Sequence, residues 1–358
     1  MSAPTIAAAL ERGRNGFTGL RLMLALAVVV SHAFSVATGA AGDEPLARLT
    51  GYTLGEHAVN GFFAVSGFLV TMSCDRRGIR DYALARTLRI LPGLVAATLA
   101  VSLGLGAALT RLPVAEYLRD PALWSFIRGT LTTFKSNAYL PGVFESNPYR
   151  APLGTVWTLK YEVLCYLGVL VAALCGLLRR RWSALLIVAG LALALSIVAG
   201  LRGPDLPKGT ETALRLPLIF AAGAALYLWR ARLRISGAAL ACLAVGAFIL
   251  ARTPAYPALL FLAEAYGAVW LAVGPMARRL FDPPADLSYG IYLYGWPIQQ
   301  SLHVLWPQAS GLALLIPALG LTLLVATLSW YGIERPALAL KARALGRRRL
   351  GTIEPAGP

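Results

Sequence analysis

Long apolar stretches separated by short polar connections run through almost the whole chain. A helix that spans a bilayer needs about 20 mostly apolar residues, and ten segments approach that length. The strands of a membrane barrel would instead alternate over about ten residues, and this chain shows no such alternation. The pattern predicts an all-α, polytopic membrane helix bundle. The ten predicted spans cover residues 17–37, 56–74, 88–110, 154–178, 182–200, 211–229, 235–251, 254–274, 286–305 and 310–332.

The composition agrees with this fold class. Of the 358 residues, 57% are hydrophobic and 14% are charged, and the mean hydropathy is +0.64. Soluble domains are roughly 45–50% apolar and about 25% charged, so the chain is unlike a soluble enzyme or a disordered protein. The four cysteines show no metal or disulfide spacing, and we expect no metal site. The simplest organisation is one integral-membrane domain over 1–340 and a basic tail over 341–358.

The basic residues predict the orientation. If the N-terminus is cytoplasmic, most of the 33 lysines and arginines fall on the cytoplasmic side, including the clusters 179–181 and 347–349. The positive-inside rule then places both termini in the cytoplasm. We interpret the tail, and the net charge of +16, as an anchor to anionic lipid headgroups rather than a nucleic-acid site. The one long connection, 111–153, becomes an outer loop, and its residues 114–134 suggest an interfacial helix.

Arg21 and His32 are ionisable residues inside the first predicted span. Such residues cost about 2.5–3.5 kcal/mol at mid-bilayer and usually face a cavity. Their spacing of 11 residues puts both on one helix face, about 16 Å apart along the axis. Each has a simpler explanation, because Arg21 could reach the inner interface and His32 could be a hydrogen-bonded interior histidine. The pair on one face favours function.

Arg86 and Arg89 share a helix face at the predicted cytoplasmic start of the third span. One interpretation is an ordinary positive flank. The other is a clamp for phosphate groups, which guanidinium binds in a forked geometry.

Three further segments carry candidate residues. Near the outer end of the fourth span, Trp157 fits an interfacial belt, whereas Glu162 needs a partner, for which Lys160, Arg215 and His32 are candidates. Residues 61–68, GFFAVSGF, contain small residues that permit close helix packing, and Ser66 lacks the surroundings of a hydrolase nucleophile. In the ninth span, the aromatic residues are explained mostly by packing, with substrate lining as the alternative. They are Tyr289, Tyr292, Tyr294 and Trp296.

Six motifs in chain order resemble acyltransferase family 3, the bacterial integral-membrane O-acyltransferases. Arg21 and His32 match the family's Arg-x10-His, and VNGFFAVSGFLV (59–70) resembles its Phe-Phe-x-x-Ser-Gly-Phe segment, with Asn60 where many members carry Asp. ARTLRILPG (85–93), LGTVWTLKYEVLCYL (153–167), LSYGIYLYGWPIQQ (287–300) and WYGIERP (330–336) supply the others. One departure is Gly295, where many members carry His. The match corresponds to the stand-alone form without an added esterase-like domain.

The resemblance implies a multi-pass protein of the bacterial inner membrane that moves an acyl group from cytoplasmic acyl-CoA, usually acetyl-CoA, to a hydroxyl of a cell-surface polysaccharide or lipid-linked sugar. No permanent cofactor is implied. Arg21, Arg86 and Arg89 are then candidates for holding CoA phosphates. His32 is the candidate general base or, alternatively, a covalent acyl carrier, with Glu162 orienting it or positioning the acceptor. Asn60, Ser66, Trp157, Tyr289 and Tyr292 are candidates for substrate binding.

Two other functions are compatible with the same composition. A transporter or flippase for a lipid-linked or small polar substrate would also have many spans and buried charges, but matched half-structures are not evident. A non-catalytic scaffold that keeps the fold is the other rival. The sequence leaves the acceptor, the oligomeric state and the length of the acyl group open.

Overall fold

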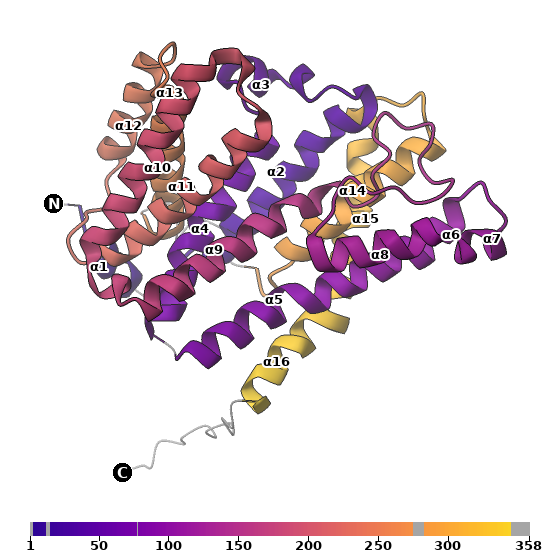
Figure 1. Ribbon diagram of the computed structural model, residues 1–358, viewed down its shortest axis with the longest axis horizontal. Helices are drawn as coiled ribbons and strands as arrows, with labels where there is room; N and C mark the ends of the chain where they lie inside the picture. Colours follow the sequence, from indigo (N-terminus) through magenta and orange to yellow (C-terminus); the bar gives the residue numbers. More distant parts are fainter. Residues whose placement is uncertain (1–2, 12–14, 77, 275–282, 345–358) are drawn as a thin grey trace.

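The computed structural model describes residues 3–11, 15–76, 78–274 and 283–344. Across these ranges the chain is helical apart from turns and one isolated bridge between Thr5 and Arg234. The predicted all-α bundle is therefore confirmed (Figure 1). The part of the predicted basic tail beyond residue 344 lies outside the described residues, as do residues 275–282.

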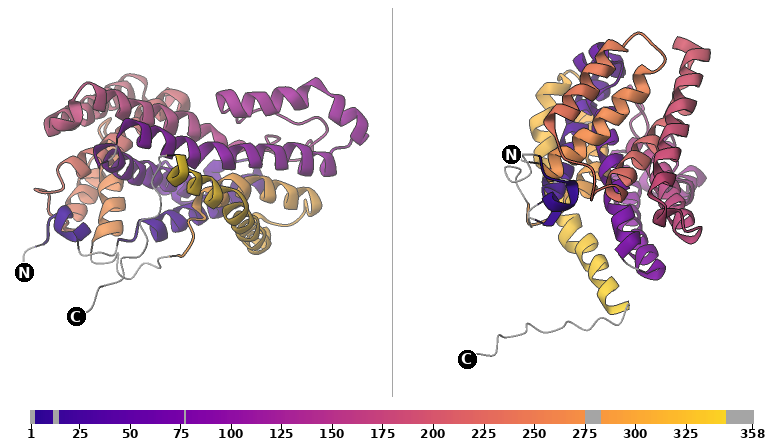
Figure 2. Two further views of the ribbon diagram at one scale, coloured as in Figure 1. Left: turned by 90° about the horizontal axis from the view of Figure 1, so that it is seen from below. Right: turned by 90° about the vertical axis from the view of Figure 1, so that its left-hand side faces the viewer.

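Most of the helices follow one another with short connections; the long one lies between α8 and α9. In chain order they are α1 (Ile6–Glu11), α2 (Phe17–Thr38), α3 (Pro45–Thr50), α4 (Leu54–Arg76), α5 (Ile79–Leu99), α6 (Gly106–Leu109), α7 (Val114–Arg119), α8 (Pro121–Thr133), α9 (Trp157–Leu174), α10 (Arg181–Arg202), α11 (Lys208–Leu228), α12 (Gly237–Ile249), α13 (Tyr256–Val273), α14 (Ser288–Leu305), α15 (Gly311–Ser329) and α16 (Arg335–Ala344). Single π-helical segments join α5 to α6 and α15 to α16. Helix α16 projects away from the bundle (Figure 2).

Each of the ten predicted spans contains a helix, and among the described residues eight helical segments are long and apolar enough to cross a membrane. Helix α12 has 13 residues and is too short by itself. Helix α14 is not among the eight, because its polar residues make it less apolar. Those polar side chains form hydrogen bonds within the protein. Gln299 donates to the carbonyl of Val29, and Gln300 donates to that of Tyr149. Helix α14 is thus an interior helix, with most of its residues buried.

Helix α4 lies at the centre and packs against α2, α11 and α13. The approach to α11 is closest at two glycines. A Cβ atom at Gly67 would lie 2.0 Å from the carbonyl oxygen of Phe220, and one at Gly223 would lie 2.1 Å from that of Ala64. Small residues allow such contact between helix backbones, so the close-packing interpretation of residues 61–68 holds at Gly67.

The outer loop is largely folded. Residues 114–134, predicted as an interfacial helix, form α7 and α8. Their side chains Tyr117, Leu123 and Phe126 enter a hydrophobic cluster with α5, and the Tyr117 hydroxyl donates to the carbonyl of Ser102 at 2.6 Å. The remainder of the loop runs back over the end of α14 (Figure 1). The loop therefore covers one end of the bundle and lines the chamber described below.

Candidate active site

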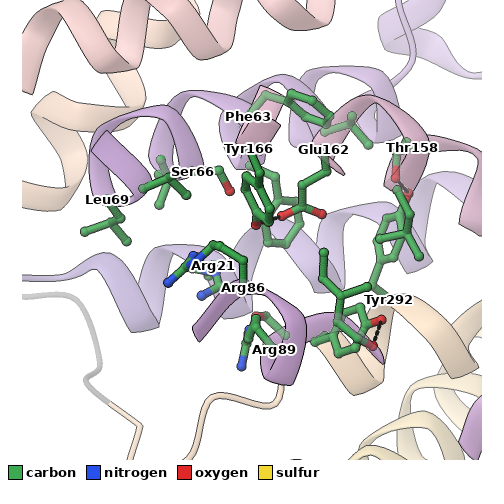
Figure 3. A pocket seen from close by; sticks show the side chains of 18 residues that line it. Arg21, Phe63, Ser66, Leu69, Arg86, Arg89, Thr158, Glu162, Tyr166 and Tyr292 are labelled. Carbon is green, nitrogen blue, oxygen red and sulfur yellow. Dashed lines mark hydrogen bonds between the residues drawn. The ribbon is translucent and has the colours of Figure 1, made fainter. Parts of the chain in front are cut away.

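A chamber rich in arginine lies among α2, α4, α5, α9 and α14. We call it the inner chamber; it encloses about 760 Å³, counting the part open to solvent. Arg21, Arg86 and Arg89, the three predicted donor-binding residues, all line it, and Figure 3 shows their guanidinium groups on the same side of the chamber. Glu162 faces them from α9. Ser66, Tyr289 and Tyr292 also contribute to the lining.

Asp286, just before α14, organises two of these arginines. Its Oδ2 lies 2.9 Å from Arg21 Nη1 and 2.8 Å from Arg89 Nη2, and its Oδ1 accepts from the Ser288 hydroxyl at 2.5 Å. Burial by itself would raise the pKa of this carboxyl, but the two guanidiniums and Ser288 hold the pKa below its usual value. Asp286 is therefore a charged bridge between α2 and α5, and sequence reasoning missed it.

Arg86 differs from its two neighbours. In the described part of the chain it forms no ion pair; its Cζ lies 5.5 Å from the centre of the Tyr166 ring, and its buried Nε has no hydrogen-bond partner. The hydroxyl of Tyr166 donates to Glu162. Arg86 is thus the guanidinium with unused donors at the inner chamber.

His32 lines a second chamber toward the outer loop. This outer chamber encloses about 1600 Å³, counting its open part. The His32 ring meets the ring of Trp296 edge-on at 4.9 Å, and Trp296 Nε1 donates to the carbonyl of Ala151 at 2.7 Å. The buried Nδ1 of His32 has no hydrogen-bond partner among the described residues. His32 is therefore not the fully hydrogen-bonded interior histidine that was the alternative.

The two chambers share Val59 and Tyr292 in their linings. Tyr292 is held firmly, since its hydroxyl donates to the carbonyl of Thr155 at 2.9 Å and lies 2.7 Å from the Thr158 hydroxyl. A molecule that reached from the arginines to His32 would pass these two side chains.

Glu162 and His32 do not meet. Glu162 lines the inner chamber with Tyr166 as its hydrogen-bond partner, whereas His32 lines the outer one. The other predicted partners of Glu162 are also engaged elsewhere. Arg215 lies 3.6 Å from Glu56 and 3.3 Å from Glu211, and Lys160 lies over the ring of Tyr161.

The remaining candidates divide between the chambers and the core. Trp157 lines the outer chamber. Asn60 lines neither chamber; its amide donates to Glu264 at 2.6 Å, and Glu264 also contacts His57. Asn60 therefore takes part in a polar network between α4 and α13.

Gly295 stands where many members of the resembling family carry His. A Cβ atom there would lie 2.7 Å from a methyl group of Val29 on α2. A histidine would therefore require the Val29 side chain, or the two helices, to shift. The ring that faces His32 in this chain comes from the next residue, Trp296.

Comparison with known proteins shows the family of the chain. The family model described as "Acyltransferase domain" matches residues 14–331. The chain is 30% identical to "Nodulation protein 10" of Rhizobium leguminosarum bv. viciae, over 94% of this chain and 96% of that protein. It is 25% identical to the "O-acetyl transferase" of Shigella phage Sf6, over 90% and 95% respectively. No solved structure matches the chain significantly. The chain belongs to acyltransferase family 3 and is a multi-pass membrane O-acyltransferase.

Proposed function

We propose that the enzyme moves an acetyl group from cytoplasmic acetyl-CoA, through the bundle, to a hydroxyl of a cell-surface glycan or lipid-linked sugar. The observation that supports the proposal is the shared lining at Val59 and Tyr292, where the arginine-rich chamber and the chamber of His32 adjoin. The membrane of action is then the bacterial inner membrane. The name of the phage relative, an O-acetyl transferase, supports acetyl as the group moved.

The arginines suit the phosphate end of the donor. Arg86 offers free guanidinium donors, while Asp286 already neutralises part of the charge of Arg21 and Arg89. Arg86 therefore makes the main phosphate contact, with Arg89 beside it. The 11 residues from Arg21 to His32 correspond to about 16 Å of helix, a length that an extended pantetheine arm can cover.

His32 supplies the chemistry. Its ring nitrogen takes the proton from the acceptor hydroxyl, the oxygen attacks the thioester carbonyl, and the carbon–sulfur bond breaks to release CoA, whose sulfur receives the proton. General base catalysis of this kind contributes roughly a hundredfold or more to a rate. A covalent acyl-histidine is the alternative order of the same steps. Because Glu162 lies beside the arginines, we assign it to the donor end rather than to His32.

The outer chamber suits a sugar acceptor. Tyr149, Trp157 and Trp296 line it with aromatic rings, and Glu56 and Lys208 add groups that can hydrogen-bond to hydroxyls. Aromatic rings with an apolar face and a polar edge bind amphipathic molecules such as sugars.

Two experiments test the proposal: one detects the acetylated product, and the other follows the acetyl group from the donor. Mass spectrometry of cell-surface glycans from strains with and without the gene should reveal an acetyl ester that disappears with the gene. Purified enzyme in liposomes, supplied with labelled acetyl-CoA and such a glycan, should transfer the label. An enzyme that transfers no label to any hydroxyl of that glycan would refute the assignment.

Arg86 gives a sharper prediction about the donor. Arg86→Ala should raise the KM for acetyl-CoA about tenfold or more, because a charge-assisted contact to phosphate is lost, with a smaller change in kcat. Arg80→Ala, an exposed arginine one to two turns earlier on α5 and outside the chamber, is the matched control. An unchanged KM in Arg86→Ala would remove Arg86 from the donor site.

A further inference from the structure

An apolar groove lies on the membrane-facing side of the bundle, away from both chambers. It encloses about 850 Å³, counting its open part, between α9, α10 and α11. Its wall includes Leu164 and Gly168 of α9, Ile187 and Leu191 of α10, and Pro217 of α11. Helix α10 has only 11% of its span buried, the smallest share among the eight. The groove therefore opens toward lipid.

One end of the groove leads into a basic mouth. The mouth is lined by Arg179, Arg180, Arg181 and Arg230. The groove and the mouth share four lining residues, so they adjoin. The shared residues are Leu177, Leu178, Ser183 and Leu228. Arg230 lies 3.8 Å from Asp75, whereas the three consecutive arginines have no acidic partner in the described part of the chain.

Two tryptophans place the mouth at the level of the lipid headgroups. Trp182 is 62% exposed and meets Trp229 edge-on at 4.7 Å. Trp229 in turn donates to the carbonyl of Arg181, whose guanidinium lies 5.0 Å from the centre of the Trp229 ring. Tryptophan gathers at membrane–water interfaces, and clustered arginines mark the cytoplasmic one.

The depth of the groove matches one leaflet. Arg181 at the mouth and Leu191 in the groove are ten residues apart on α10, which is about 15 Å. Half of a hydrocarbon core of about 30 Å has the same depth. The groove therefore has the length of a single acyl chain that begins at the headgroup level.

We propose that this site binds one anionic phospholipid of the cytoplasmic leaflet, with its phosphate among the arginines at 179–181 and one acyl chain in the groove. Basic pockets between membrane helices on the cytoplasmic side hold anionic headgroups, and guanidinium binds phosphate in a forked geometry. The bound chain packs against α9, which also carries Glu162 into the inner chamber. The lipid thus supports a helix of the active site.

Native mass spectrometry of the purified full-length protein tests this site without measuring catalysis. At limiting lipid, the protein should retain one phosphatidylglycerol about tenfold or more in preference to phosphatidylcholine with the same chains. Replacing Arg179, Arg180 and Arg181 together by Gln should abolish this preference. The matched control replaces Arg76, Arg80 and Arg335, other exposed arginines of the predicted cytoplasmic side, and should keep it.

The groove is tested separately. A Cβ atom at Gly168 meets nothing within 4 Å, and Gly168 lines the groove. Gly168→Leu adds a side chain to this wall and should weaken retention of phosphatidylglycerol several-fold. Gly190 of α10 is equally open but lies outside the groove, so Gly190→Leu should bind normally. Equal retention of both lipids, normal binding by Gly168→Leu, or equally tight binding of free glycerol 3-phosphate would each overturn the proposal. Thermal unfolding of each variant establishes that it is folded.

Discussion

At the scale of single residues, the account rests on a histidine with an unused nitrogen. His32 is packed against Trp296 and faces a chamber, and its buried Nδ1 has no protein partner in the described residues. A buried polar atom without a partner costs about 1–3 kcal/mol. A cost of this kind is typical of a site where a substrate completes the hydrogen bonding.

His32→Ala should therefore lower kcat for acetyl transfer roughly a hundredfold or more, with little change in the temperature of unfolding. His303→Gln is the control, because His303 is also a buried histidine with a free Nδ1 but lines neither chamber. Rates measured with labelled acetyl-CoA distinguish the two. Substantial activity in folded His32→Ala would remove the proposed base.

Asp286→Asn should affect stability and donor binding together. Removing this charge leaves Arg21 and Arg89 close together without their shared carboxylate, and breaking a buried pair costs about 3–5 kcal/mol; partial exposure here places the expected loss at the lower end of that range. We expect a lower unfolding temperature and a higher KM for acetyl-CoA. Asp43→Asn breaks an exposed pair with Arg48, so it should change neither. If Asp286→Asn behaves like that control, the bridge does not position the arginines.

The sequence predicted much of this site but not its pairings. The motifs predicted that Arg21, Arg86 and Arg89 bind the same end of the donor, and all three line the inner chamber. The bridge to Asp286 joins residues 265 positions apart, and no local pattern indicates such a contact. A contact between Glu162 and His32, one of the alternatives considered for Glu162, is not formed. Helical spacing orders side chains on one helix but does not align two helices.

At the scale of helices, hydropathy predicted where the helices lie. It did not predict that α14 is an interior helix or that α12 is too short to cross a membrane by itself. Helix α14 is interior, so its polar residues bond within the protein rather than to water. Helix α12 is a short helix beside α13. The sequence predicts a helix in the outer loop. It does not predict that this segment packs against α5, because Tyr117 and Phe126 contact residues that are distant in sequence.

The contact between α4 and α11 gives a prediction about stability. Gly67→Ala should destabilise the protein by about 1–3 kcal/mol, because the new methyl group would collide with the backbone at Phe220. Gly190→Ala, on the open face of α10, is the control and should be neutral or slightly stabilising. Thermal unfolding in one detergent measures both. Equal stability of the two variants would mean that the helices can separate without cost.

At the scale of the whole molecule, the bundle holds two chambers of different chemistry in series. The positively charged chamber is formed by residues near the predicted cytoplasmic ends of α2 and α5, and the chamber of His32 lies under the outer loop. A donor and an acceptor on opposite sides of the membrane can therefore meet within one protein. Val59 and Tyr292 lie where the two chambers adjoin, so the proposed transfer route runs beside these two side chains.

The most direct test of this central claim is a cryo-EM structure of the enzyme with a non-hydrolysable thioether analogue of acetyl-CoA. The account predicts phosphates at Arg86 and Arg89, the pantetheine arm beside Val59 and Tyr292, and the acetyl carbon within contact distance of the His32 ring. An analogue whose acetyl end stays in the inner chamber beside Glu162, or which binds outside both chambers, would contradict it.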